Sequence, residues 1–218
     1  MSYSFIPVSA FKLKTESREV LALDTRSASY FAEGFVPLSL NVPLNTEESQ
    51  EIINVFGPQQ PVIIICESDK IEESIQFIKK LGYPFIEGFL KDGFLGWKNA
   101  GENIDLLITI EADELAMDIP HDDNLIVLDV RTPVEYAEGH IEDAQSLPLM
   151  SMSDPAGIAL LPENANLYLH CSNMVRSMIA AGIFKQHGLH NVRVVNSLWT
   201  EIKNTPGIKI ENTAPDPD

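Results

Sequence analysis

The chain has 218 residues, a length that allows one large domain or two domains of about 100 residues each. Its 32 acidic and 15 basic side chains give a net charge of −17, which argues against nucleic acid and anionic membranes as partners. Neither a run of 18 apolar residues nor a basic start followed by an apolar stretch is present, so we expect no transmembrane helix, no signal peptide and a cytoplasmic location.

Hydrophobic periodicity and the Gly and Pro breakers predict the elements of the first half of the chain. They are, in chain order, a helix over 8–14, a strand over 20–23, a short helix within 24–33, an extended segment over 36–43, a helix over 46–55, a strand over 62–66, a helix over 72–81, a strand at 85–86, and a turn over 91–97 that leads into a helix.

The second half repeats this order after a crossing segment and a helix over 111–117. We expect a strand over 125–130, a helix over 133–138, an extended segment over 144–148, a strand over 167–171, a helix over 176–186, a strand over 192–195 and a helix over 198–203. The alternation of short strands with helices predicts an α/β fold with a mainly parallel central sheet in each half. The polar, Pro-rich tail 213–218 is not expected to be ordered alone.

The two halves are copies of one unit at an offset of 105 residues. Matching segments are 21–26 and 126–131, 31–36 and 136–141, 42–44 and 147–149, and 62–66 and 167–171. The repeat predicts two domains, 1–104 and 105–212, with Cys66 and Cys171 at equivalent strand ends. These two cysteines are too few for a disulfide framework, and the five histidines lack zinc-ligand spacing, so no metal and no cofactor is expected.

Cys171 ends an apolar strand and precedes a polar loop and an apolar helix. Loop amides and the positive end of the helix would stabilise an anion there and lower a thiol pKa. Arg176 would add a permanent positive charge and a fork for an oxyanion. A strand-end cysteine can equally be a small core residue, so the local pattern leaves both readings open.

The second copy resembles the rhodanese family of sulfurtransferase domains. Asp129-Val-Arg131-Thr-Pro-Val-Glu135-Tyr136, followed by Glu138-Gly-His140-Ile141, is similar to the family's strand-turn-helix signature, and Cys171-Ser-Asn-Met-Val-Arg176-Ser177 is similar to its active loop. The pair of copies also resembles the tandem rhodanese tail of some persulfide dioxygenase fusions. The resemblance implies that the chain is a sulfurtransferase in which Cys171 takes a sulfane sulfur from thiosulfate or a persulfide and passes it to a thiol, cyanide or protein acceptor. It implies that the substrate-binding residues are Ser172, Asn173, Met174, Val175, Arg176 and Ser177.

Several positions of the second copy depart from the family pattern. Met174 stands where the loop usually has Gly, so Met174 is strained or the bend has moved to Asn173. Asn196-Ser-Leu198 replaces a Gly-Gly turn, and Ile202 stands where a Trp is common. We therefore expect activity that is low or selective.

The first copy matches the family more weakly, mainly through Asp24-Thr-Arg26 and Lys91–Trp97. Its loop has Ile71 in place of the arginine and acids around Cys66, which raise a thiol pKa and repel an anionic donor. We expect Cys66 to be structural and this domain to be an inactive packing or recognition partner. The Asp-Arg pairs of both copies, with His140, are expected to stabilise turns. The His170 side chain should point away from that of Cys171.

Two other functions compete with sulfur transfer. The chain could be a binding module that carries persulfide or docks on a partner enzyme. Phosphatase or arsenate-reductase chemistry is the third alternative, but such loops have five residues between Cys and Arg, whereas four lie between Cys171 and Arg176.

Overall fold

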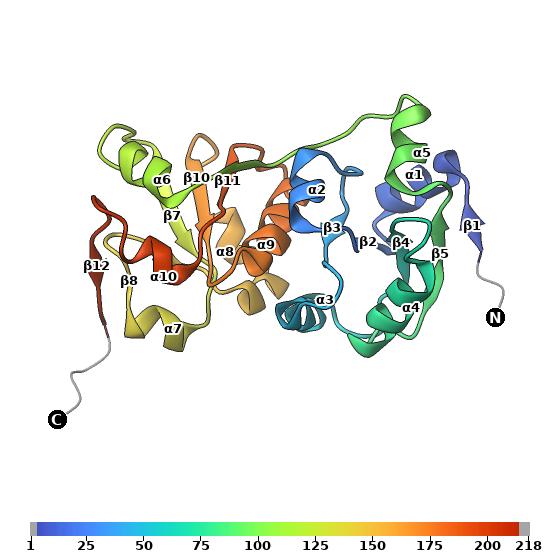
Figure 1. Ribbon diagram of the computed structural model, residues 1–218, viewed down its shortest axis with the longest axis horizontal. Coiled ribbons are helices and arrows are strands. Elements are labelled where there is room, and N and C mark those ends of the chain that lie inside the picture. Colours follow the sequence, from blue (N-terminus) through green and yellow to red (C-terminus); the bar gives the residue numbers. More distant parts are fainter. Residues whose placement is uncertain (1–3, 214–218) are drawn as a thin grey trace. The chain divides into compact units, whose positions relative to one another are not determined.

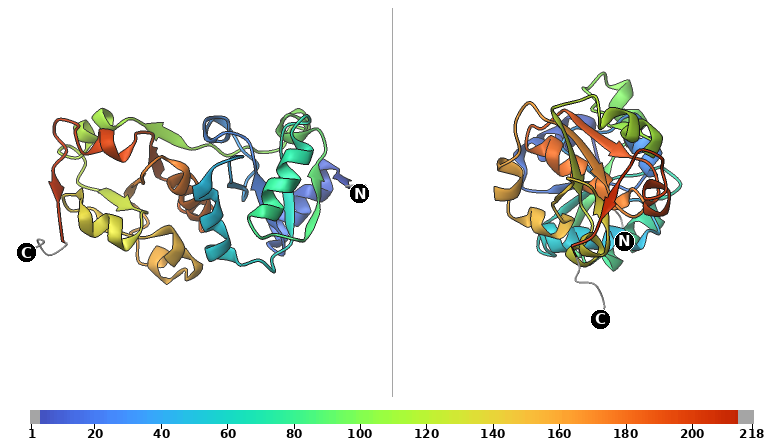
Figure 2. Two further views of the ribbon diagram at one scale, coloured as in Figure 1. Left: turned by 60° about the horizontal axis from the view of Figure 1, so that its bottom comes forward. Right: turned by 90° about the vertical axis from the view of Figure 1, so that its left-hand side faces the viewer.

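The structure, a computed structural model, describes residues 4–213. It consists of two compact units that divide between Leu107 and Ile108 and are connected by one stretch of chain, drawn in green in Figure 2. The division falls three residues after the expected boundary. The Phe35–Asp105 backbone bridge and the Leu107 amide, which donates to the Ala32 carbonyl oxygen, hold this stretch on the first unit.

The first unit alternates strands and helices (Figure 1). Its strands are β1 (Phe5–Ile6), β2 (Leu21–Asp24), β3 (Leu40–Asn41), β4 (Val62–Ile65) and β5 (Ile86–Leu90), and its helices are α1 (Val8–Ser17), α2 (Ala28–Glu33), the 3₁₀ helix Glu47–Glu51, α3 (Ile52–Phe56), α4 (Ile71–Lys80) and α5 (Gly93–Asn99).

The second unit repeats this order with small additions. Its strands are β6 (Ile108–Ile110), β7 (Leu125–Asp129), β8 (His140–Ile141), β9 (Gln145–Ser146), β10 (Asn166–His170), β11 (Val192–Val195) and β12 (Ile210–Glu211), and its helices are α6 (Ala112–Asp118), α7 (Pro133–Glu138), the 3₁₀ helix Leu149–Ser153, α8 (Ala156–Ala159), α9 (Val175–Gln186) and α10 (Trp199–Ile202).

Each unit is built on a five-stranded sheet in which every neighbouring pair is parallel. The strand orders, β1-β5-β4-β2-β3 and β6-β11-β10-β7-β9, are equivalent under the repeat. The sequence of β4, Val62-Ile-Ile-Ile65, explains its central place, because a strand of a parallel sheet is covered on both faces and all four side chains are fully buried. The expected α/β class with mainly parallel sheets is confirmed.

The observed elements differ from the expected ones at a short 3₁₀ turn and at two-residue strands that form by pairing with a distant strand. The expected helix 46–55 is a 3₁₀ turn followed by the five-residue α3. The two-residue strands β1 and β12 exist only through their partners β5 and β8, so local periodicity gives no signal for them. Residues 214–218 of the expected tail lie outside the described residues, and the Thr213 amide donates to the Ala137 carbonyl oxygen.

Candidate active site

The two cysteines follow the central strands of the two sheets. Cys66 comes directly after β4 and Cys171 directly after β10, at the carboxyl edge where parallel α/β sheets place their sites. Both thiols are free, with exposed fractions of 6% for Cys66 and 1% for Cys171. The repeat therefore puts a thiol at the same structural position twice.

The loop after Cys171 turns at Met174 and enters α9. Met174 has φ 72° and ψ −26°, a left-handed conformation, and Asn173 is not among the described residues with positive φ. The bend thus stays at the position that Gly usually holds and has not moved to Asn173. A left-handed non-Gly residue costs on the order of 1 kcal/mol, which the rest of the fold must offset. The Ser172 carbonyl oxygen accepts from the Trp199 amide at 3.0 Å, which fixes the first half of the loop.

The side-chain carboxylate of Glu135, on α7, clamps this loop. Its Oε2 accepts from Arg176 Nη1 at 2.7 Å, and its Oε1 accepts from Arg176 Nη2 at 2.8 Å and from Ser172 Oγ at 3.0 Å. Arg176 Nη2 also contacts Ser172 Oγ. The Thr132 amide and hydroxyl donate to Oε2 at 2.9 and 2.7 Å. These donors, Arg176 first, hold the pKa of Glu135 well below its usual range.

The clamp changes the environment of Arg176 from the one that the sequence suggests. The guanidinium is buried, and both of its Nη groups donate to a carboxylate instead of facing an open space sized for an oxyanion. The sequence places Glu135 in the family's strand-turn-helix signature, but it does not predict that Glu135 contacts the loop after Cys171. The T-x-x-E pattern from Thr132 to Glu135 is a capping box and signals the helix start, but it gives no hint of a partner 41 residues away.

Beneath the loop, Asp129 and Arg131 form a buried pair that fixes the end of β7. Arg131 Nε and Nη2 donate to the carboxylate, at 2.6 Å for the Nη2 bond, and Nη2 also donates to the Gly139 carbonyl oxygen. Trp199 lies over this pair, with the guanidinium carbon 3.8 Å from its ring centroid. The corresponding pair in the first unit, Arg26 and Asp24, makes the same bonds.

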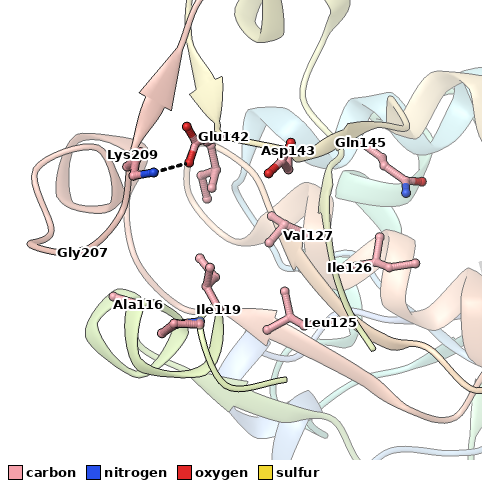
Figure 3. A pocket seen from close by; sticks show the side chains of 12 residues that line it. Ala116, Ile119, Leu125, Ile126, Val127, Glu142, Asp143, Gln145, Gly207 and Lys209 are labelled. Carbon is pink, nitrogen blue, oxygen red and sulfur yellow. Dashed lines mark hydrogen bonds and ion pairs between the residues drawn. The ribbon is translucent and has the colours of Figure 1, made fainter. Parts of the chain in front are cut away.

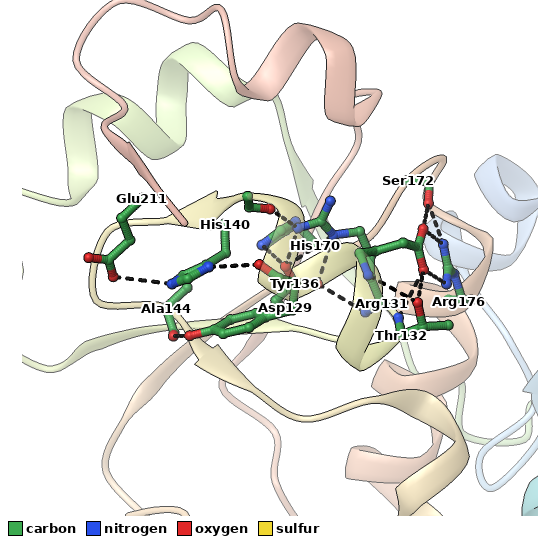
Figure 4. A network of polar contacts seen from close by, with 12 residues as sticks. Asp129, Arg131, Thr132, Tyr136, His140, Ala144, His170, Ser172, Arg176 and Glu211 are labelled. Carbon is green, nitrogen blue, oxygen red and sulfur yellow. Dashed lines mark hydrogen bonds and ion pairs between the residues drawn. The ribbon is translucent and has the colours of Figure 1, made fainter. Parts of the chain in front are cut away.

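His170 and His140 lie near the Asp129–Arg131 pair, and we call these four side chains the polar layer. The His170 ring stacks on Trp199 with centroids 5.6 Å apart, and its Nε2 lies 3.5 Å from Asp129 Oδ2. Burial lowers the pKa of His170 to about 4. The His140 ring stacks on Tyr136, and its nitrogens contact the Tyr136 carbonyl oxygen and Glu211 (Figure 4). Their contacts are with Trp199, Asp129, Tyr136 and Glu211, which suits residues that support the site.

The remaining loop residues close the first turn of α9. Val175 and Ser177 are buried, and Ser177 Oγ has no hydrogen-bond partner among residues 4–213. Asn173 and Met174 are half-buried. The structure thus brings Ser172 and Arg176 together with Glu135, while the other loop residues form the backbone turn between Cys171 and the helix.

A hollow opens beside the Cys171 loop, and the first unit has its counterpart. The second-unit hollow has a volume of about 540 Å³ and includes Arg131, Glu135, Ser172 and Trp199. Every residue lining it has a partner 105 positions earlier in a hollow of about 470 Å³ in the first unit. Cys66 lines the first-unit hollow, whereas Cys171 is not among the residues that line the other.

The first unit has none of the three side chains, Glu135, Ser172 and Arg176, that form the clamp in the second. Tyr30, Glu67 and Ile71 stand at the positions of Glu135, Ser172 and Arg176. Burial raises the pKa of the Cys66 thiol to about 11, and the nearby carboxylates of Asp24, Glu67 and Asp69 act in the same direction. A thiol of this pKa is almost entirely protonated at pH 7, which supports the expectation that Cys66 is not a nucleophile.

This pKa predicts slow alkylation at Cys66. In a Cys171→Ser variant, the rate with iodoacetamide should rise about tenfold per pH unit from pH 7 to 10, because the thiolate fraction does so below the pKa. Peptide mass spectrometry of quenched samples measures the rate, and urea-unfolded protein is the control. A plateau below pH 9 would contradict the raised pKa.

Within residues 4–213 there is no group of three or more His, Cys, Asp or Glu side chains that could hold a metal ion. No helix in the same residues is long and apolar enough to cross a membrane.

The protein is of the α/β class: each of its two units has a parallel sheet with a cysteine directly after the central strand. The family model described as Rhodanese-like domain matches residues 8–100 and 111–205, so the chain belongs to the rhodanese-like domain family. A protein of Allochromatium vinosum named as a sulfurtransferase is 28% identical over 83 residues, which are 38% of this chain and 76% of that protein.

Among solved structures, the chain is similar at low sequence identity to the following proteins. A thiosulfate sulfurtransferase from Pseudomonas aeruginosa has 18% identity and a TM-score of 0.40 over 97% of this chain, which spans 44% of that chain's length. The rhodanese-like domain of a protein from Anabaena sp. has 21% identity and a TM-score of 0.43 over 48% of this chain and 78% of its own. The family expected from the sequence is confirmed by the match of the family model over both halves of the chain.

Proposed function

We propose that the second unit transfers a sulfane sulfur through a persulfide on Cys171. The observation that carries this is the position of Cys171 at the end of β10, directly before a loop that Glu135 and Arg176 hold in a defined turn. The Cys171 thiolate attacks the outer sulfur of the donor, the sulfur–sulfur bond of the donor breaks, and sulfite or a thiolate leaves. An acceptor thiolate or cyanide then attacks the outer sulfur of the persulfide and regenerates the Cys171 thiolate.

The charges around the loop favour a persulfide over thiosulfate as the donor. Glu135 neutralises Arg176, and Asp129 neutralises Arg131, so neither guanidinium offers an unbalanced charge to a dianion. A persulfide carries at most one negative charge and needs less compensation. The resemblance of the tandem arrangement to the tail of persulfide dioxygenase fusions stays a prediction, and it favours the same donor class.

The test is the intact mass of the full chain after incubation with thiosulfate or a small persulfide. Wild type and Cys66→Ser should gain one sulfur atom, and Cys171→Ser should gain none. Cyanide or a thiol should then remove the added sulfur. A gain that survives in Cys171→Ser would exclude Cys171 as the carrier, and no gain with either donor would overturn sulfur transfer altogether.

A persulfide-carrying module is the second candidate function. The strained Met174 turn and the 1% exposure of Cys171 favour it, because both restrict the approach of a second substrate. Its signature in the same experiment is a sulfur atom that loads onto Cys171 but that small acceptors do not remove. Phosphatase chemistry is disfavoured, because the Arg176 Nη groups that would bind a tetrahedral oxyanion already bind Glu135. A cytoplasmic location and a protein acceptor stay predictions.

A further inference from the structure

A second cavity of the second unit lies away from the Cys171 loop. It has a volume of about 440 Å³ and is lined by the amino-terminal half of β7, by α6, and by residues of the segments 141–145 and 207–209. We name it the β7 cavity. The other end of β7, at Asp129, belongs to the polar layer beside the Cys171 loop.

The β7 cavity lies beside Ala116, whereas two aromatic side chains fill the equivalent part of the first unit. Phe11 and Trp97 are buried there with Val36, and their rings meet edge to face with centroids 6.4 Å apart. The indole of Trp97 also donates to the Asn103 carbonyl oxygen. At the equivalent positions, 105 residues later, stand Ala116 and Ile202.

Other substitutions between the two copies restore part of this volume, because Tyr168 stands where the first copy has Ile63 and is buried with Ile202, yet a cavity of about 440 Å³ remains beside Ala116. Val20 and Ala22 become the slightly larger Leu125 and Val127, which return only a few of the carbon atoms that the two rings supplied. Leu125 is half-buried, whereas Val20, its counterpart beneath the Phe11 and Trp97 cluster, is buried. A cavity of roughly 150 Å³ with apolar walls already binds benzene, so this volume is ample for an aromatic ligand.

The walls and the rim of the β7 cavity differ in character (Figure 3). Ile119, Leu125 and Val127 form an apolar wall, and Glu142 and Asp143 lie across from it at the mouth. Lys209 binds Glu142, with Nζ and Oε2 2.8 Å apart, and so neutralises one of the two carboxylates. The rim therefore keeps one unbalanced negative charge, on a protein whose net charge is −17.

We propose that the β7 cavity binds a small aromatic amine. The ring lies against Ala116 and the apolar wall, next to the position that Phe11 fills in the first unit, and the ammonium group lies at the mouth near Asp143. A carboxylate on the same ring system is repelled by that rim. This site is independent of sulfur transfer at Cys171, and its test does not use that reaction.

The test titrates full-length protein with three probes of one ring system: tryptamine, indole and indole-3-acetate. Calorimetry should rank tryptamine first, indole second and indole-3-acetate last. Methyl NMR of wild type should show shifts from tryptamine that centre on Ile119, Leu125 and Ile141, all of which line the cavity. This mapping needs no variant, so it decides the location even if a substitution fails to fold.

Ala116→Phe restores the residue of the first copy and fills the cavity. It should weaken tryptamine binding by at least about tenfold, because its ring would take the ligand's place. Met117→Phe, at the 61% exposed neighbour on the same helix, should leave the affinity unchanged. Circular dichroism checks that both variants fold. The proposal is overturned by unshifted methyl groups at millimolar tryptamine, by equal binding in folded Ala116→Phe, or by indole-3-acetate that binds as tightly as tryptamine.

Discussion

The Glu135→Gln variant is expected to lose about 2–3 kcal/mol of unfolding free energy, although glutamine has nearly the same shape as glutamate. Every group around the carboxylate is a donor: the amide and hydroxyl of Thr132, the hydroxyl of Ser172 and both Nη groups of Arg176. The amide NH₂ of glutamine would face these donors without an acceptor, and the buried guanidinium would lose its counter-charge. This energy loss is smaller than the loss from breaking a fully buried ion pair, because the Glu135 side chain is 33% exposed.

The loss is measured by urea unfolding, with hydrogen exchange of the β10 backbone amides as the readout for the second unit. Glu138→Gln is the matched control, because Glu138 is exposed on the same helix and should tolerate the same change. The loop should also loosen, so the rate of persulfide formation at Cys171 should fall in Glu135→Gln and not in the control. Equal stability of the two variants would show that the clamp contributes nothing to the fold.

His170 should make the second unit sensitive to mild acid. Burial lowers its pKa to about 4, whereas an unfolded histidine has a pKa near 6.5. As the pH falls below 6.5 the unfolded state takes up a proton and the folded state resists, so stability is complete above pH 6.5 and is lost toward pH 4. The difference in pKa corresponds to a loss of at most about 3 kcal/mol.

The chain itself suggests the variant that tests this. Ile65 occupies the equivalent strand position in the first unit, so His170→Ile places a side chain that this fold already accepts. Its unfolding free energy should change less between pH 7 and pH 4.5 than that of wild type. His190→Gln removes an exposed histidine and should keep the wild-type slope. Identical slopes in wild type and His170→Ile would contradict the lowered pKa.

The fold class, the repeat and the positions of both cysteines follow from local patterns in the sequence. Period-two and helical patterns, together with Gly and Pro breakers, are local signals, and the run Val62-Ile-Ile-Ile65 reads as a strand covered on both faces. The offset between the copies placed Cys66 and Cys171 at equivalent strand ends. The motif around Cys171 then indicated the family, which the match over both halves confirmed.

The side chains that surround the two cysteines depend on contacts between distant parts of the chain, which form when it folds. Glu135 meets Arg176 from 41 residues away, so no local pattern could show that the expected anion-binding fork is already neutralised. Met174 keeps the left-handed turn because the strand and helix on either side fix the loop, a choice that the sequence left open. The exchange of Phe11 and Trp97 for Ala116 and Ile202 is visible in the sequence, but a cavity depends on how the neighbours repack, and that is set by packing in three dimensions.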